Sequence, residues 1–367
     1  MYDFENGILP IQYLSGLIDQ GIVAPILPIN VKQLQPASLD LRLGYKAYRI
    51  RASFLPRPNH TVEERLGQLL LHEIDLTKSA VLDPGCVYIV PLLESLNLPL
   101  KVSASTNPKS STGRLDVFTR VICDGVNAFD CIPAGYNGPL FAEICPQTFP
   151  IKVRTGSSVC QIRFRIGSCM ETDNDLKLLH THETLVMGGM QTDISNGISL
   201  SVNLSEELSE SSGGLVGYRA KRNTTCIDID KPASCSISNF WEPIYADSSN
   251  CFVLDPDQFY ILASKEAVHI PPSHAAEIIP FNPSVGEFRV HYAGFIDPGF
   301  GHGVSQSNGT KVVLEVRSHK VPFILEDGQI IGRLVFERMH ARPDVLYGKE
   351  LGSHYYNQAL KLSKHFV

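Results

Sequence analysis

An internal repeat constrains this chain more than any other feature of its sequence. The segment Val81–Pro84 occurs again as Val253–Pro256, 172 residues later. The same offset relates further identical residues: Tyr88 and Tyr260, Pro99 and Pro271, Glu143 and Glu315, Gly156 and Gly328, and Phe164 and Phe336. Constant spacing over so many positions is typical of a duplicated unit. We therefore expect two diverged copies of one fold.

Short apolar runs between turn-forming residues predict that both copies are rich in strands. The 367 residues include 28 Gly and 24 Pro, and Val87–Val90 is one of many short apolar runs. Ser38–Leu43 and Ser199–Leu204 both alternate with period two, as half-buried strands do. One short helix is expected over Pro10–Gln20, with Gly21 as its C-terminal cap. The predicted fold class is mainly β with few short helices.

The repeat also predicts how the chain is divided. The first domain is expected over residues 1–170, a connecting segment over 171–198, and the second domain over 199–367. The polar stretch Ser205–Gly214 is expected to be a surface loop.

Composition excludes several classes of protein. The nine cysteines include no C-x-x-C pair, which indicates a reducing compartment and a cytoplasmic location. Asp3 and Glu5 stand where a signal peptide would be basic, and no apolar stretch approaches the length of a membrane span. The net charge of -6 argues against nucleic-acid binding and leaves room only for a local basic pocket.

One segment of the first copy has the composition of a phosphate-binding turn. Asn107–Leu115 reads NPKSSTGRL, so that three hydroxyl groups lie between the cations of Lys109 and Arg114 directly after a proline. Hydroxyl groups, free backbone N–H groups and cations at a tight turn bind phosphate oxygens. An ordinary solvated turn would have the same composition, so this segment alone leaves both interpretations open.

In the second copy, a carboxylate interrupts an apolar run. Ala293–Phe300 is expected to be a strand that enters a tight turn, and Val312–Val316 the strand that returns from it as a hairpin. Glu315 could face water in such a strand, or face a pocket where burial would raise its pKa for acid–base chemistry. Spacing alone does not decide between these two orientations.

Taken together, these motifs resemble the signature of dCTP deaminases in the trimeric dUTPase-like superfamily. The resemblance consists of Lys-Ser-Ser-x-x-Arg, then Ala-x-x-Ile-Asp-Pro-Gly-aromatic, then Val-Leu-Glu, and includes the strand Pro36–Gly44. Tyr347, His354 and Gln358 match the spacing of the family's substrate-closing tail. The resemblance implies two dUTPase-like distorted antiparallel β-barrel or jelly-roll domains, with active sites between neighbouring domains.

The resemblance also implies roles for particular residues. Glu315 would activate a water molecule for attack on C4 of cytosine, and Ser110, Arg114 and the Ala293 carbonyl would hold that water. The substrate-binding residues would be Lys109 and Ser111 at the triphosphate, Asp297 at the deoxyribose, Val313 at the base, and Tyr347, His354 and Gln358 in the tail. Mg²⁺ would arrive on the phosphates, and no zinc is expected, because the His-x-Glu and Pro-Cys-x-x-Cys pattern of zinc deaminases is absent.

Each copy has lost a different part of this signature. The first copy has Pro133 where the sugar-binding aspartate is expected, and the second has Asn282–Glu287, without a basic residue, as its phosphate turn. Complementary loss predicts one shared site, in which the first copy binds phosphate and the second reads and attacks the base. The alternative general base is Glu143, which could meet Ser110 and Arg114 of a neighbouring chain if three first copies packed together.

The expected reaction is hydrolysis of dCTP to dUTP and ammonia, which would supply dUTP for thymidylate synthesis. A bifunctional deaminase and dUTPase that releases dUMP and pyrophosphate is the nearest alternative, and a nucleotide-sensing protein without turnover is another. The resemblance further implies a homo-oligomer and dTTP as a possible feedback inhibitor. The stretch 302–310 lengthens the second copy relative to the family pattern, and we expect an inert loop there.

Overall fold

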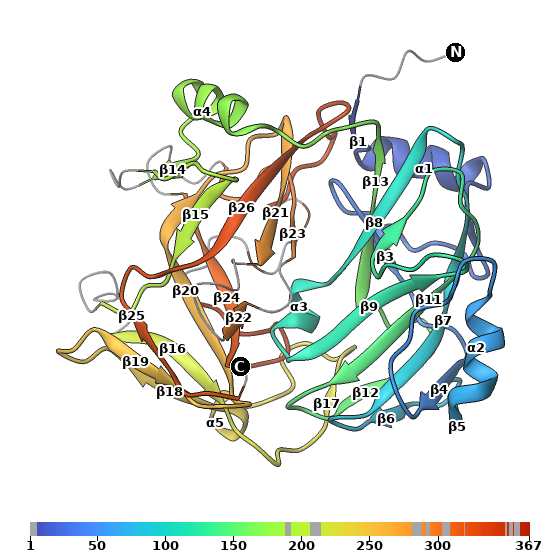
Figure 1. Ribbon diagram of the computed structural model, residues 1–367, viewed down its shortest axis with the longest axis horizontal. Coiled ribbons are helices and arrows are strands. Elements are labelled where there is room, and N and C mark those ends of the chain that lie inside the picture. Colours follow the sequence, from blue (N-terminus) through green and yellow to red (C-terminus); the bar gives the residue numbers. More distant parts are fainter. Residues whose placement is uncertain are drawn as a thin grey trace.

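The structure is a computed structural model of the 367-residue chain. It describes residues 6–187, 192–205, 214–280, 288–290, 294–302, 309–318, 320–348, 351, 355 and 360–367, with 280 and 288–290 described by their backbone alone. Figure 1 shows the first half of the chain, blue to green, beside the second half, yellow to red. The predicted mainly β fold with few short helices is confirmed.

Three sheets are built mainly from the first half. The first has the order β1-β13-β8-β10, with β3 paired to β13, and the second has the order β5-β4-β7-β11-β9, with β2 paired to β7. The third is small, with the order β17-β12-β6. Their strands are β1 (Gly7–Ile8), β2 (Val23–Pro25), β3 (Leu39–Leu41), β4 (Lys46–Ile50), β5 (Leu70–Asp75), β6 (Ala80–Leu82), β7 (Val87–Asn97), β8 (Val102–Pro108), β9 (Val117–Cys123), β10 (Cys131–Ile132), β11 (Asn137–Pro146), β12 (Ile151–Val153), β13 (Cys160–Ile166) and β17 (Ile227–Asp228).

The second half repeats this arrangement. Its sheets have the orders β18-β16-β20-β24-β22, with β14 paired to β20, then β15-β26-β21-β23, then β19-β25. Their strands are β14 (Val186–Met187), β15 (Ile198–Ser201), β16 (Leu215–Ala220), β18 (Trp241–Tyr245), β19 (Cys251–Leu254), β20 (Phe259–Val268), β21 (His274–Pro280), β22 (Phe288–Val290), β23 (Phe295–Ile296), β24 (Thr310–Ser318), β25 (Phe323–Glu326) and β26 (Ile330–Arg338).

Strand register shows that the two halves have equivalent backbones. In the first half Phe164 pairs with Ala104 across β13 and β8, and in the second half Phe336 pairs with Ala276 across β26 and β21. Both pairs are related by the sequence offset of 172 residues. The repeat in the sequence is therefore a repeat of strand pairing, as expected for two copies of one fold.

The helices are short, and the first of them is the one predicted from sequence. The helical segments are α1 (Ile11–Asp19), the 3₁₀ turn η1 (Val31–Gln33), α2 (Val62–Leu69), α3 (Ser110–Gly113), α4 (Asp173–His182) and α5 (Ile237–Phe240). Helix α1 buries Leu14 and Leu17, and Gly21 follows it with a positive φ of 68° that suits glycine. No helix among the described residues is long and apolar enough to cross a membrane.

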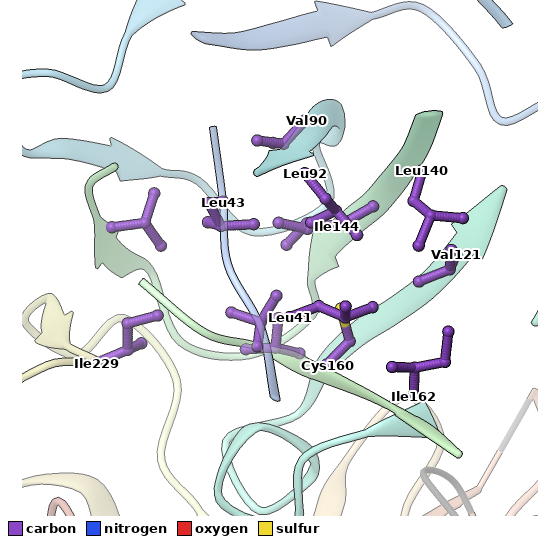
Figure 2. Packing of buried hydrophobic residues seen from close by; sticks show 14 of the residues in the cluster. Leu41, Leu43, Val90, Leu92, Val121, Leu140, Ile144, Cys160, Ile162 and Ile229 are labelled. Atoms are coloured by element: carbon purple, nitrogen blue, oxygen red, sulfur yellow. The ribbon is translucent and has the colours of Figure 1, made fainter. Parts of the chain in front are cut away.

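The two halves share one hydrophobic core and the second half has another of its own. The shared core contains first-half residues together with Trp241, Phe240 and Phe366 from the second half, which make edge-to-face or tilted contacts around Phe149. Figure 2 shows Ile229 among the buried side chains of this core. Strand β17 also extends a first-half sheet by parallel pairing of Ile227 with Ile151. Phe366, near the C-terminal end of the chain, is thus part of the packing between the halves.

A buried arginine makes several polar contacts between the halves. Arg163 on β13 has no exposed side-chain surface, and it donates 3.0 Å to Glu337 Oε2 on β26 and 3.3 Å to the Ala276 carbonyl on β21. Its guanidinium lies 4.0 Å above the ring of Phe295 on β23. Removing one member of a buried charge pair leaves the other without compensation.

Arg163→Met should therefore lower the free energy of unfolding by about 3 kcal/mol, the lower part of the usual range, because Glu337 keeps a second partner in Arg165 at 2.9 Å. Urea denaturation at neutral pH measures the change. Lys320→Met is the control, since Lys320 is 81% exposed and pairs with Asp257 at the surface. Equal unfolding midpoints for the two variants would contradict the bridging role of Arg163.

Candidate functional site

A cavity of about 1030 Å³ is lined by residues of both halves. The first half contributes the predicted phosphate turn, with Lys109, Ser110, Ser111 and Arg114. The second half contributes Asp297, Val313, Glu315 and Tyr347. The structure therefore brings together, within one chain, the two sets of residues that the sequence assigns to different copies.

The phosphate turn follows the end of β8. Lys109 precedes the single helical turn α3, and its ammonium forms an ion pair with the Asp40 carboxylate. Asp40 lies on β3, where pairing with Gln161 of β13 fixes its position. Asp40 and Gln161 also line the cavity. Neither residue was predicted to belong to the site, because an acidic residue between Leu39 and Leu41 fits an ordinary half-buried strand.

The prediction that Ala293–Phe300 and Val312–Val316 form a hairpin is wrong. Strand β23 pairs with β21, whereas β24 pairs with β20 and β22 in a different sheet. The Asp297–Gly301 turn carries the chain from one sheet to the other, so that Asp297 and Glu315 reach the cavity from separate sheets. Gly299 has a φ of 94°, and a Cβ there would lie 2.8 Å from the Leu346 side chain. This turn therefore requires glycine.

Asp297 is held at the cavity by the bridging arginine. Its Oδ1 lies 3.6 Å from Arg163 Nη2 and has no hydrogen-bond partner among the described residues. Burial raises the pKa of Asp297 to about 6, which the Arg163 charge opposes and the Asp40 charge reinforces. A buried carboxylate oxygen without a donor is well placed to accept a hydrogen bond from a ligand.

Glu315 faces the cavity and is buried. It lies on β24 opposite Ile261, and its side chain lines the cavity with that of Val313. Burial raises the pKa of Glu315 well above its ordinary value; the nearby Arg114 opposes this shift and Asp116 adds to it. Of the two orientations that the sequence left open, the one that faces water is wrong. A carboxyl group with a raised pKa accepts protons readily near neutral pH.

The end of the chain positions Arg114 beside Glu315. The Arg114 guanidinium lies 3.8 Å above the ring of Tyr355, and its Nη1 donates 2.8 Å to the Lys361 carbonyl. Tyr347 packs near Phe300, and its backbone N–H donates 2.9 Å to Pro298. Of the three predicted tail residues, Tyr347 lines the cavity, and His354 and Gln358 lie outside the described residues.

The comparisons with known proteins decide the family. Residues 5–168 match the N-terminal domain of 2'-deoxycytidine 5'-triphosphate deaminase, and residues 172–366 match its C-terminal domain. The chain belongs to the dCTP deaminase family. It is accordingly an enzyme of this family, whose members are hydrolases that act on a C–N bond.

Solved and curated relatives agree with this family. A crystal structure of 2'-deoxycytidine 5'-triphosphate deaminase from Agrobacterium tumefaciens is 55% identical, with a TM-score of 0.86 over 91% of this chain and 99% of that one. A dUMP-forming dCTP deaminase of Methanosphaera stadtmanae is 29% identical over 43% of this chain and 78% of its own length. One of Halobacterium salinarum, also dUMP-forming, is 37% identical over 38% of this chain and 67% of its own length.

Glu143, the alternative general base, occupies the equivalent position in the first half of this dCTP deaminase family member. It lies opposite Ile89 as Glu315 lies opposite Ile261. Its Oε1 accepts 2.8 Å from Arg120, which stacks on Phe118 and Phe129. Glu143 is not among the described residues that line the cavity. Within one chain, therefore, the structure does not bring Glu143 to Ser110 and Arg114.

Several predicted positions lie outside the described residues. These are Ala293, His354, Gln358, the second copy's phosphate turn at 282–287, residues 206–213 of the expected loop, and residues 303–308 of the insertion. Two cavity residues of the tail, Tyr355 and Lys364, were not predicted, and no sequence spacing pointed to Lys364. In the described part of the chain, no group of three or more His, Cys, Asp or Glu side chains is placed to hold a metal ion.

Replacing Glu315 and Glu143 by the neutral residue glutamine should have opposite effects on the free energy of unfolding. Because the folded pKa of Glu315 lies above its ordinary value of 4.5, folding binds a proton, and the wild type loses stability as pH rises from 4.5 through the folded pKa. Glu315→Gln removes that loss, so its unfolding free energy relative to the wild type should increase between pH 4.5 and pH 8. Glu143→Gln breaks an ion pair and should be destabilised at neutral pH.

Thermal unfolding of the wild type and both variants across this pH range measures the effect. A stability difference between Glu315→Gln and the wild type that does not change with pH would show that Glu315 is not buried with a raised pKa.

Proposed function

We propose that the protein hydrolyses dCTP to dUTP and ammonia without zinc, at one site that both halves of the chain share. The observation that carries this proposal is the cavity in which the buried Glu315 carboxyl and the cationic Lys109–Arg114 segment face the same space. Family membership supports dCTP deamination, and the geometry supports these residues as the groups that perform it.

Glu315 is the proposed general base and proton carrier. It takes a proton from water, and the hydroxide attacks C4 of cytosine while the proton passes to N3. A second proton, from the new C4 hydroxyl group, passes through Glu315 to the amino group, and ammonia leaves with the C4–N bond electrons. Ser110, Arg114 and the Ala293 carbonyl are proposed to hold the water, of which Ser110 and Arg114 line the cavity beside Glu315.

The remaining cavity residues are proposed to bind the nucleotide. Asp297 would accept a hydrogen bond from the deoxyribose through its buried and unpartnered Oδ1. Val313 would contact the base, and Lys109 and Ser111 the phosphates, with Tyr347, His354 and Gln358 closing over the substrate. Mg²⁺ would enter as part of the nucleotide substrate. Water activation is proposed to depend on Glu315, because the sequence lacks the His-x-Glu and Pro-Cys-x-x-Cys pattern by which zinc deaminases bind their metal.

Release of dUMP and pyrophosphate is the second candidate reaction. It is favoured by the curated relatives of Methanosphaera stadtmanae and Halobacterium salinarum, both named as dUMP-forming. A relative of Halorubrum lacusprofundi is named as a dCTP deaminase without that product. The same cavity could serve both reactions, because both need the nucleotide held by its sugar and phosphates.

Protein treated with a chelator and then supplied with Mg²⁺ should release ammonia from dCTP with dUTP as the product. Ammonia detection combined with nucleotide separation measures both. Accumulation of dUMP and pyrophosphate would establish the bifunctional reaction instead, and activity restored only by added zinc would contradict the zinc-independent mechanism.

Glu315→Gln should lower kcat by about a hundredfold or more, as expected when a general base is removed, while dCTP binding measured by calorimetry is retained. Glu143→Gln is the matched control, because it makes the same change at the equivalent backbone position. Loss of turnover in the Glu143 variant alone would contradict the shared site and favour a site between chains.

A further inference from the structure

The last residues of the chain form a strap across one end of the cavity, here called the C-terminal strap, residues 360–367. Ser363 Oγ donates 2.8 Å to the Ser111 carbonyl of the phosphate turn, and His365 Nε2 lies 2.8 Å from the Ile229 carbonyl. The backbone N–H of Ala233 donates 2.9 Å to the Lys364 carbonyl. Ser363 and His365 are both buried, so Lys364 lies between two anchored neighbours.

Lys364 lines the cavity together with Lys109. Its ammonium has no hydrogen-bond or ion-pair partner among the described residues, whereas Lys109 is paired with Asp40. Burial lowers the pKa of Lys364, and the neighbouring Lys109 charge lowers it further. Like charges that face each other in a partly buried cavity are unfavourable unless an anion lies between them.

The carboxylates at this end of the cavity are already engaged. Asp40 pairs with Lys109, and Asp230 pairs with Arg154 and accepts 2.6 Å from Ser157. Both carboxylates favour the charged form of Lys364, but neither forms a direct ion pair with it. This end of the cavity therefore retains a cation without a counterion of its own in the described part of the chain, which is the arrangement that a phosphate group would complete.

We propose that Lys364 binds the phosphate chain of the nucleotide and sets the preference of the enzyme for triphosphates. This proposal rests on the proposed function, since it assigns a further residue to the same site. Lys364 approaches from the C-terminal strap and Lys109 from the phosphate turn, so the phosphates are held from two sides. The hydrogen bond from Ser363 to the Ser111 carbonyl joins these two segments.

The test compares Lys364→Met with Lys364→Arg and with the control Lys320→Met, a surface lysine outside the cavity. In Lys364→Met, KM for dCTP should rise about tenfold, the usual effect of losing one hydrogen bond to a charged group, with kcat changed much less. The affinity for inorganic triphosphate, measured by calorimetry, should fall by a similar factor. Deamination of dCMP should change little, and Lys364→Arg should recover most of the lost affinity.

The melting temperature shows whether Lys364→Met acts on nucleotide binding or on the packing of the protein. Because the Lys364 charge is unfavourable without an anion, Lys364→Met should melt at the same temperature as the wild type or higher. An unchanged KM for dCTP and an unchanged triphosphate affinity would overturn the proposal, whether or not the melting temperature falls. Failure of the wild type to release ammonia would overturn the proposed function, while triphosphate affinity would still decide the role of Lys364.

Discussion

The contact of Arg163 with the second half is the interaction on which the site depends. A guanidinium without water must find acceptors inside the protein, and Arg163 finds them on β21, β23 and β26 of the other half. The same group lies beside Asp297, so the contact that joins the halves also places the carboxylate that faces the ligand cavity. Stability of the interface and geometry of the site are therefore coupled.

The two copies keep one backbone and differ in electrostatics. Glu143 and Glu315 occupy equivalent positions on β11 and β24, yet Glu143 is neutralised by Arg120, and Glu315 faces a cavity with a raised pKa. The ion pair with Arg120 suits Glu143 to a structural role, because it neutralises the buried carboxylate. Glu315 is buried and has no ion-pair partner among the described residues. Such a carboxyl suits acid–base chemistry, because its proton affinity is higher. The same position of the fold thus carries an ion-paired glutamate in the first copy and a buried carboxyl with a raised pKa in the second.

The end of the chain also links the two halves, and it does so beside the cavity. Within the C-terminal strap, Phe366 packs into the shared core against Trp241, and Ser363 contacts the phosphate turn of the first half. Tyr355 and the Lys361 carbonyl hold Arg114 beside Glu315. Each half contributes part of the cavity, and the strap contacts residues of both halves, so the cavity depends on segments that are far apart in the sequence.

The sequence by itself determined the duplication, the mainly β class, helix α1 and a minority of the cavity residues, those of the phosphate turn and of the Asp297 and Glu315 motifs, because strand periodicity and motif spacing are local and survive in the order of residues. Only the tertiary structure decided that β23 and β24 belong to different sheets, that Glu315 faces the cavity, and that Asp40 and Lys364 join it. Those features depend on contacts between residues far apart in the chain, and burial and pairing are set by which segments meet in space.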